Sequence, residues 1–233
     1  MKIKGVLFDW DLTMARVLGD ASPEMRLQSL FQWAGMAYSI DEVTTAVSST
    51  RLAMKLNGHI LQTQREIARY YQHILRDLGE PNTSWAVANY LYDAYSYMPS
   101  VVYEDTLPTL RYLDNVGIKL GIISNHSRLI RPVIEDTVGD LIDSEHIIIS
   151  QELGTYKPAP PIFLHAAAAL KLPPESCVFI GDNLEGDAIG AVKSGEFQTG
   201  LWLDRGEGEQ TAVSPLPPNV HRITTLGDVV DYI

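Results

Sequence analysis

Five short apolar runs constrain the fold of this chain most, because each is nearly continuous where an amphipathic strand would alternate. They lie at residues 3–8, 120–124, 146–150, 177–181 and 199–203. Runs of this length and composition are typical of strands buried on both faces, as in a parallel sheet. We therefore expect these residues to form the centre of one parallel sheet.

Helical segments separate the later runs. Residues 105–116 carry Leu107, Leu110 and Leu113 at a spacing of three, and Gly117 follows as a C-terminal stop. We also expect helices over 158–170 and 185–194, and a last strand with a short helix over 221–233. This alternation of strand and helix predicts an α/β fold with a doubly wound parallel sheet.

Residues 15–98 differ from the rest of the chain, because no buried-strand run occurs there. The pair Ser22-Pro23 is a good helix start, with proline at the first helical position, and residues 64–78 have a helical pattern. We expect a helical domain at 15–98, inserted into a core domain formed by residues 1–14 and 99–233.

Polar residues stand where three of the apolar runs end: Asp9, Ser124 and Asp182. In open parallel sheets these carboxyl ends line the ligand crevice. Asp9 and Asp11 are two residues apart, so their carboxylates point to one side if the strand continues. Asp187 follows Asp182 in a stretch that leads from a strand end into a helix. The carboxylates are thus expected to converge.

Convergent carboxylates are costly unless a cation compensates them, and Mg²⁺ prefers such oxygen ligands. Any one of these acidic residues could be an ordinary solvated loop position, but the joint pattern favours a magnesium site. Residues 182–187 lack the alternating ligands of an EF-hand. They also lack the Gly-Lys-Ser/Thr of a phosphate-binding P-loop.

Four segments, in order and spacing, resemble the motifs of the haloacid dehalogenase-like superfamily. They are Phe-Asp-Trp-Asp-Leu-Thr at 8–13, Ile-Ile-Ser-Asn at 122–125, Tyr-Lys-Pro at 156–158 and Gly-Asp-Asn-Leu-Glu-Gly-Asp at 181–187. Leu12 departs from the usual glycine, and Ala159 from the usual acidic residue. The resemblance covers 1–14 and 99–233 and implies a Rossmann-like core, with residues 15–98 as a helical cap.

The resemblance also implies catalytic roles. Asp9 is expected to be the nucleophile that attacks phosphorus. Asp11 is expected to protonate the leaving oxygen and then to activate water. Lys157 is expected to offset the negative charge of the nucleophile and the phosphate.

Binding roles follow from the same resemblance. Mg²⁺ is expected to be held by Asp9, Asp182 and the backbone carbonyl of Asp11, with Asp187 as a further ligand or as support for the others. The Ser124 hydroxyl and the Asn125 backbone N–H are expected to bind the phosphate.

Three residues near these motifs have plainer interpretations. Thr13 could either stabilise its turn alone or take part in the site, and the sequence does not decide between the two. His126 is interpreted as a loop histidine, and Arg205 as a structural residue.

Composition narrows the function further. The net charge of -11 argues against nucleic acid as a partner. The single cysteine, Cys177, excludes a disulfide within one chain and is expected to be a buried strand residue. No secretory signal and no apolar stretch long enough for a membrane are evident. We expect a soluble cytoplasmic enzyme acting on a small phosphorylated metabolite, with the metabolite and the oligomeric state left open.

Three other functions remain open. A dehalogenase of the same superfamily would need neither Mg²⁺ nor the second aspartate, so Asp11 favours phosphoryl transfer. A phosphomutase would retain the same motifs. A non-catalytic protein that binds a phosphorylated ligand is the third, although retention of Asp9, Asp11, Lys157 and Asp182 argues against it.

Overall fold

The computed structural model describes residues 2–18, 22–56, 61–206 and 215–233. The chain divides into two compact units. One comprises Met1–Arg16 and Val101–Ile233, and the other comprises Val17–Ser100. Each unit is described by itself.

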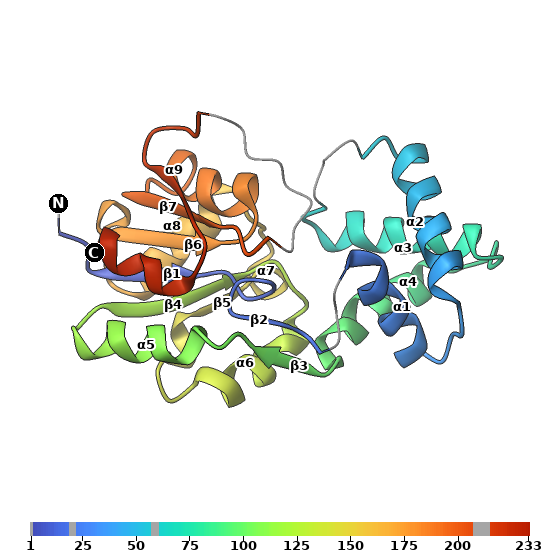
Figure 1. The fold of residues 1–233 in the computed structure, drawn as a ribbon, viewed down its shortest axis with the longest axis horizontal. Helices are drawn as coiled ribbons and strands as arrows, with labels where there is room; N and C mark the ends of the chain where they lie inside the picture. Colours follow the sequence, from blue (N-terminus) through green and yellow to red (C-terminus); the bar gives the residue numbers. More distant parts are fainter. Residues whose placement is uncertain (1, 19–21, 57–60, 207–214) are drawn as a thin grey trace. The chain divides into compact units, whose positions relative to one another are not determined.

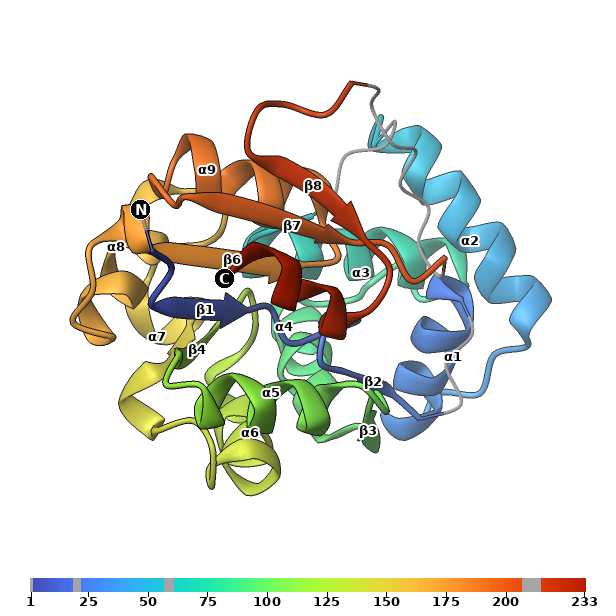
Figure 2. The same cartoon turned by 60° about the vertical axis from the view of Figure 1, so that its left-hand side comes forward.

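In the first unit, six strands of the described chain form one parallel sheet. The strands are β1 (Gly5–Phe8), β4 (Lys119–Ser124), β5 (Ile147–Ile149), β6 (Cys177–Gly181), β7 (Thr199–Leu203) and β8 (Val220–Ile223). Their spatial order is β5-β4-β1-β6-β7-β8, which can be followed in Figure 1 and Figure 2. Counted along the chain this is the order 3-2-1-4-5-6 of a doubly wound fold. The predicted fold class is confirmed.

Helices cover both faces of this sheet. Val6 and Phe8 pack on the face covered by α5 (Thr106–Asn115) and α6 (Arg131–Val138). Leu7 packs on the opposite face, with α8 (Pro160–Ala169) and α9 (Gly190–Lys193). Figure 1 shows the two layers. Burial on both faces explains why the strands are nearly continuous apolar runs.

The strand order reverses between β1 and β6, which are parallel neighbours with Phe8 paired to Ile180. The ladder reaches one residue further, since the Asp9 backbone N–H donates to the Ile180 carbonyl at 2.8 Å. The loops that leave these two strands therefore emerge side by side. Ligands bind at such a reversal in open α/β sheets.

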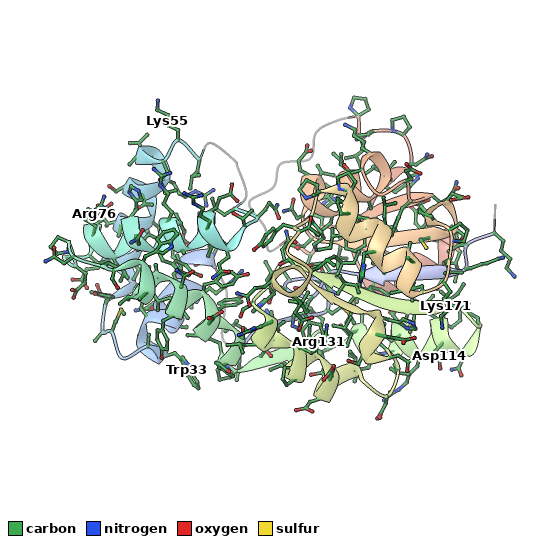
Figure 3. The ribbon with its side chains drawn as sticks, turned by 180° about the vertical axis from the view of Figure 1, so that it is seen from behind. Trp33, Lys55, Arg76, Asp114, Arg131 and Lys171 are labelled. Carbon is green, nitrogen blue, oxygen red and sulfur yellow. The ribbon has the colours of Figure 1, made fainter. Side chains whose placement is uncertain are left out.

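Shorter elements connect this framework. The one-turn helix α7 (Ser150–Leu153) follows β5, and Arg131 at the start of α6 donates to Glu152 of α7 and to the Ile147 carbonyl of β5. Arg131 is labelled in Figure 3. A π-helical turn, η5 (Leu184–Ile189), precedes α9. The 3₁₀ segments are Tyr95–Tyr97 in the second unit, and Arg128–Ile130, Ser144–His146, Pro174–Ser176 and Leu226–Tyr232 in the first.

The second unit is helical, with a core of its own. Its helices are α1 (Pro23–Trp33), α2 (Ile40–Ala53), α3 (Gln64–Asp77) and α4 (Trp85–Ala94). Each begins after a serine or threonine whose side chain accepts a backbone N–H of the first turn, as at Ser22 before Pro23. Leu30, Val47 and Ile74 are among its buried core residues.

A two-stranded sheet, β2 (Ala15–Val17) and β3 (Ser100–Val102), lies where the chain passes between the units. The sequence did not predict it. Its strands have three residues each, too few to show a period, and β3 is largely exposed.

Cys177 lies in β6 and is fully buried, as predicted. Burial raises the pKa of its thiol to about 12, so it is held as the unreactive neutral form. Across the described residues, the helices are too short or too polar to traverse a bilayer.

Candidate active site

A buried ion-pair cluster lies at the carboxyl end of the sheet. Lys157 Nζ is 2.6 Å from Asp9 Oδ1 and 2.7 Å from Asp187 Oδ1. The three residues are only 7%, 3% and 2% exposed, in the order Asp9, Lys157, Asp187. One cation thus holds two carboxylates that come from positions far apart in the chain.

The charges of this cluster shift one another's pKa values. Burial alone would lower the pKa of Lys157, but the carboxylates of Asp187 and Asp9 outweigh that effect and raise it. Lys157 is therefore a permanent cation near neutral pH. Burial raises the pKa of Asp187 to about 6, against the attraction of Lys157, and the charge of Asp9 adds to the rise.

Asp182 joins Asp9 and Asp187 in a set of possible metal ligands. One carboxylate oxygen from each lies within 4.8 Å of the other two. All three donors are carboxylate oxygens, which suits a hard divalent cation such as Mg²⁺. The donor chemistry of these residues therefore fits the predicted metal.

Asp11 is placed differently. Its carboxylate is not part of that set, and the predicted ligand at this position is the backbone carbonyl. β1 ends at Phe8, so the strand does not continue to Asp11 and strand alternation cannot orient its carboxylate relative to that of Asp9. The condition on which that step of the prediction depended, continuation of the strand to Asp11, is therefore not met.

Two glycines allow Asp187 to reach the site. A Cβ atom at Gly181 would overlap the Asp187 carboxylate, and one at Gly200 in β7 would overlap the backbone of Ala188. The η5 turn therefore packs directly on the sheet. π-helical turns are rare and often occur at functional sites.

Thr13 is fully buried and links the two strand ends that flank the reversal. Its hydroxyl donates to Asp9 Oδ2 at 3.3 Å and accepts the backbone N–H of Asp182 at 3.0 Å. Both hydrogen bonds go to predicted site residues. Thr13 thus does more than stabilise its own turn.

Arg205 binds the backbone of the loop that contains Thr13. Its guanidinium donates to both carboxylate oxygens of Asp105 and to the Thr13 carbonyl at 2.9 Å, and it stacks on Tyr103 at 3.9 Å. The predicted structural role is consistent with these contacts, and its target is the loop that carries Asp9 and Asp11.

Ser124 is the last residue of β4, and Asn125 follows it at the same end of the sheet. Ser124 is buried. The Asn125 side chain makes two hydrogen bonds with the backbone of Lys157, donating to its carbonyl at 3.0 Å and accepting its N–H at 2.8 Å. The sequence suggested only a backbone role for Asn125, and its side chain in fact fixes the segment that carries Lys157.

His126 is a loop residue, as predicted, but the loop buries it to 4% exposure. Its Nε2 lies 3.6 Å from Asp11 Oδ2. Position directly after the second motif was the only sequence signal that could have drawn attention to this residue.

Leu12 stands where the haloacid dehalogenase-like superfamily usually has glycine. Its φ of 59° explains the preference for glycine at this position. This left-handed conformation costs a residue with a Cβ atom about 1–2 kcal/mol. The chain therefore keeps the glycine-like turn between Asp11 and Thr13 without the glycine.

The seven predicted site residues thus occupy one end of the sheet. Asp9, Asp182, Asp187 and Lys157 come together directly, Asn125 contacts Lys157, and Ser124 ends the neighbouring strand. Asp11 faces His126. Their chemical roles remain predictions.

Named relatives are similar to this chain in sequence over most of its length. The chain is 30% identical to a glyceraldehyde 3-phosphate phosphatase of Methanopyrus kandleri, over 83% of this chain and 81% of the relative. It is 27% identical to a ribulose-1,5-bisphosphate 5-phosphatase of Halopiger xanaduensis, over 98% of both chains.

Solved structures share the fold. The HAD-hydrolase YfnB of Bacillus subtilis, solved with bound magnesium, matches with a TM-score of 0.75 at 17% identity, over 100% of this chain and 99% of that one. The model of the haloacid dehalogenase-like hydrolase family matches residues 3–195. This match spans all four motifs, and it confirms the resemblance and the prediction of an enzyme: the chain belongs to the haloacid dehalogenase-like hydrolases.

Proposed function

We propose that this enzyme is a Mg²⁺-dependent phosphatase that hydrolyses a small phosphate monoester through an aspartyl-phosphate on Asp9. The buried cluster of Asp9, Lys157 and Asp187, with Asp182 beside it, is the observation that carries the proposal. A carboxylate nucleophile needs no deprotonation at neutral pH. A second carboxyl residue, Asp11, is present in the same loop.

Asp9, Asp182 and Asp187 would hold the metal with the backbone carbonyl of Asp11. When bound, Mg²⁺ supplies positive charge that offsets the phosphate and polarises its oxygens. Lys157 adds a fixed cation on the side of the nucleophile, where its two ion pairs hold it.

The reaction has two steps in this proposal. An Asp9 carboxylate oxygen attacks phosphorus, the bond to the leaving oxygen breaks, and Asp11 gives that oxygen its proton. Asp11 then takes a proton from water, whose oxygen attacks phosphorus and releases inorganic phosphate and free Asp9. Ser124 and Asn125 bind phosphate oxygens in both steps.

Residues 15–98 are proposed to act as a cap domain that selects the substrate. The chain leaves the core unit shortly after Thr13 and returns to it before α5, so this insert directly follows the segment that carries Asp9 and Asp11. The two named relatives act on small phosphorylated sugars, which are therefore the first compounds to test.

The test measures phosphate release from an aryl phosphate and a panel of sugar phosphates, with Mg²⁺ and then with excess chelator. We expect activity with Mg²⁺ and none with chelator. Full activity in excess chelator would contradict the metal assignment, and halide release from a haloacid under those conditions would favour a dehalogenase.

Metal binding has a readout that is independent of turnover. Ligand binding to the folded state raises the melting temperature, so Mg²⁺ should stabilise the wild type. The shift should be strongly reduced in Asp182→Asn and retained in the matched control Asp114→Asn, an exposed aspartate of α5. Equal shifts in both variants would exclude Asp182 as a ligand.

A further inference from the structure

His126 is fixed in the site by its backbone as well as by burial. Its N–H donates to the Ser150 hydroxyl at 3.1 Å, and that hydroxyl donates back to the His126 carbonyl at 3.3 Å. Ser150 is itself buried and begins α7. The segment after β4 is thereby tied to the segment after β5, and the imidazole has a defined place.

The ring has a defined orientation too. Its Nδ1 lies 3.2 Å from the carbonyl oxygen of Ser127, and its Nε2 lies 3.6 Å from Asp11 Oδ2. A carbonyl oxygen only accepts hydrogen bonds, so Nδ1 carries a proton in this arrangement. Nε2 is the nitrogen that faces Asp11.

Asp11 needs such a neighbour. Its side chain is 32% exposed, against 5% for His126, and it stands directly before the turn at residues 12–14. A carboxyl group that must meet the leaving oxygen loses rate when its orientation is loose, because misplacement by about 1 Å can cost roughly 10²-fold.

We propose that His126 is a positioning residue that holds the Asp11 carboxyl group in the orientation in which it serves the leaving oxygen. This inference rests on the proposed phosphatase function, with Asp11 as its acid and base. The distance of 3.6 Å is longer than a direct hydrogen bond. Contacts of this kind often tighten when the substrate binds.

Two substitutions separate positioning from packing. In His126→Gln, the side-chain amide can reach the place of Nε2 and keep the contact with Asp11. In His126→Asn, the amide reaches only the place of Nδ1 and keeps the contact with Ser127. His146→Asn is the matched control, because His146 precedes β5 and so lies at the opposite, amino end of the sheet.

The measurement is kcat and KM on an alkyl and an aryl phosphate with Mg²⁺, in the wild-type and Asp11→Asn backgrounds. We expect His126→Asn to lower kcat on the alkyl phosphate by roughly tenfold or more, with KM little changed. The aryl phosphate should be affected less, since its leaving group needs less protonation. His126→Gln should restore most of the loss, and His146→Asn should match the wild type.

The double-mutant cycle gives the decisive result. If His126 acts through Asp11, then His126→Asn should cost nothing further once Asp11 is asparagine. An equal loss in both backgrounds, equal losses on both substrates, or no loss at all would overturn the inference. If His126→Asn does not fold by circular dichroism, His126→Leu replaces it, because leucine fills the buried space without a polar group.

Failure of the inference and failure of the proposed function look different. A wild-type enzyme that releases no phosphate from any substrate with Mg²⁺ would overturn both. An active wild type whose Asp11→Asn variant loses alkyl turnover, while His126→Asn does not, would overturn only the role of His126.

Discussion

The site has two sides that differ in burial and in how their charges are held. On one side Asp9, Lys157 and Asp187 form ion pairs of 2.6 and 2.7 Å and are almost inaccessible to solvent. On the other side Asp11 is 32% exposed and faces His126 at 3.6 Å. Asp9, Lys157 and Asp187 are thus held by buried ion pairs, whereas Asp11, which exchanges a proton in the proposed reaction, lies where water can reach it.

Electrostatics gives the reason for this division. Two buried carboxylates repel each other strongly, and a buried charge without a partner is very costly. Lys157 compensates both. Asp11 is partly exposed, so solvent screens its charge and a buried counter-charge is not required.

The largest expected effect is at the nucleophile. Asp9→Asn is nearly isosteric, but an amide is a very poor nucleophile, so turnover should fall by about 10⁵-fold or more. The fold should survive, since one charge leaves a crowded acidic cluster. The measurement is steady-state turnover, with circular dichroism as the folding check. The control is Asp114→Asn, at the exposed Asp114 labelled in Figure 3. Wild-type turnover in folded Asp9→Asn would refute the nucleophile assignment.

Asp11→Asn should have the next largest effect, on one class of substrate. Loss of a general acid and base typically costs roughly 10² to 10⁴-fold. The loss should be greatest for alkyl phosphates and smaller for aryl phosphates, which need less protonation. Comparable losses on the two substrates would count against Asp11 as the acid. Stability should change little, because Asp11 is partly exposed.

Lys157→Met should affect activity and stability together, which distinguishes the buried side from the exposed one. Removing one partner of a buried ion pair typically destabilises by about 3–5 kcal/mol, and loss of an electrostatic stabiliser costs roughly 10² to 10³-fold in kcat. Denaturant unfolding and turnover measure the two effects, with the exposed Lys171→Met as control. If Lys157→Met is as stable as the wild type, the ion pairs of Lys157 with Asp9 and Asp187 do not stabilise the fold.

The smallest effect concerns the link between the two strand ends. Thr13→Val keeps the shape but removes the hydroxyl, leaving the Asp182 N–H without its acceptor, so stability should fall by about 1–3 kcal/mol. Thr13→Ser retains a hydroxyl and should lose less. The measurement is the free energy of unfolding of the two variants. A loss in Thr13→Ser as large as or larger than that in Thr13→Val would contradict the hydroxyl as the group that matters most.

The sequence predicted the framework well because burial on both faces leaves a strong signal. The five apolar runs became β1, β4, β5, β6 and β7, and their polar ends came together at one edge. The acidic residues and Lys157 belong to recognisable sequence motifs, so we could expect them to lie together before the fold was known.

What the sequence missed depends on contacts between distant segments. The side-chain bonds of Asn125 to Lys157 span 32 residues, and those of Arg205 to Thr13 span 192. An asparagine or an arginine in a sequence does not indicate which distant residue it will bind. His126 is a similar case, since burial of the loop is decided by how the chain after β4 packs on Ser150. The three-residue strands β2 and β3 were too short to show a pattern.

The close packing of η5 on the sheet has a consequence for natural and laboratory variation. Gly181 and Gly200 carry no chemistry, yet any side chain at either position would collide with Asp187 or with the backbone of Ala188. In a saturation library selected for activity, both positions should therefore tolerate almost nothing, whereas Leu12 should accept glycine. Such a library would then show Gly181 and Gly200 to be as intolerant of substitution as Asp9, although the reason at the two glycines is only lack of space.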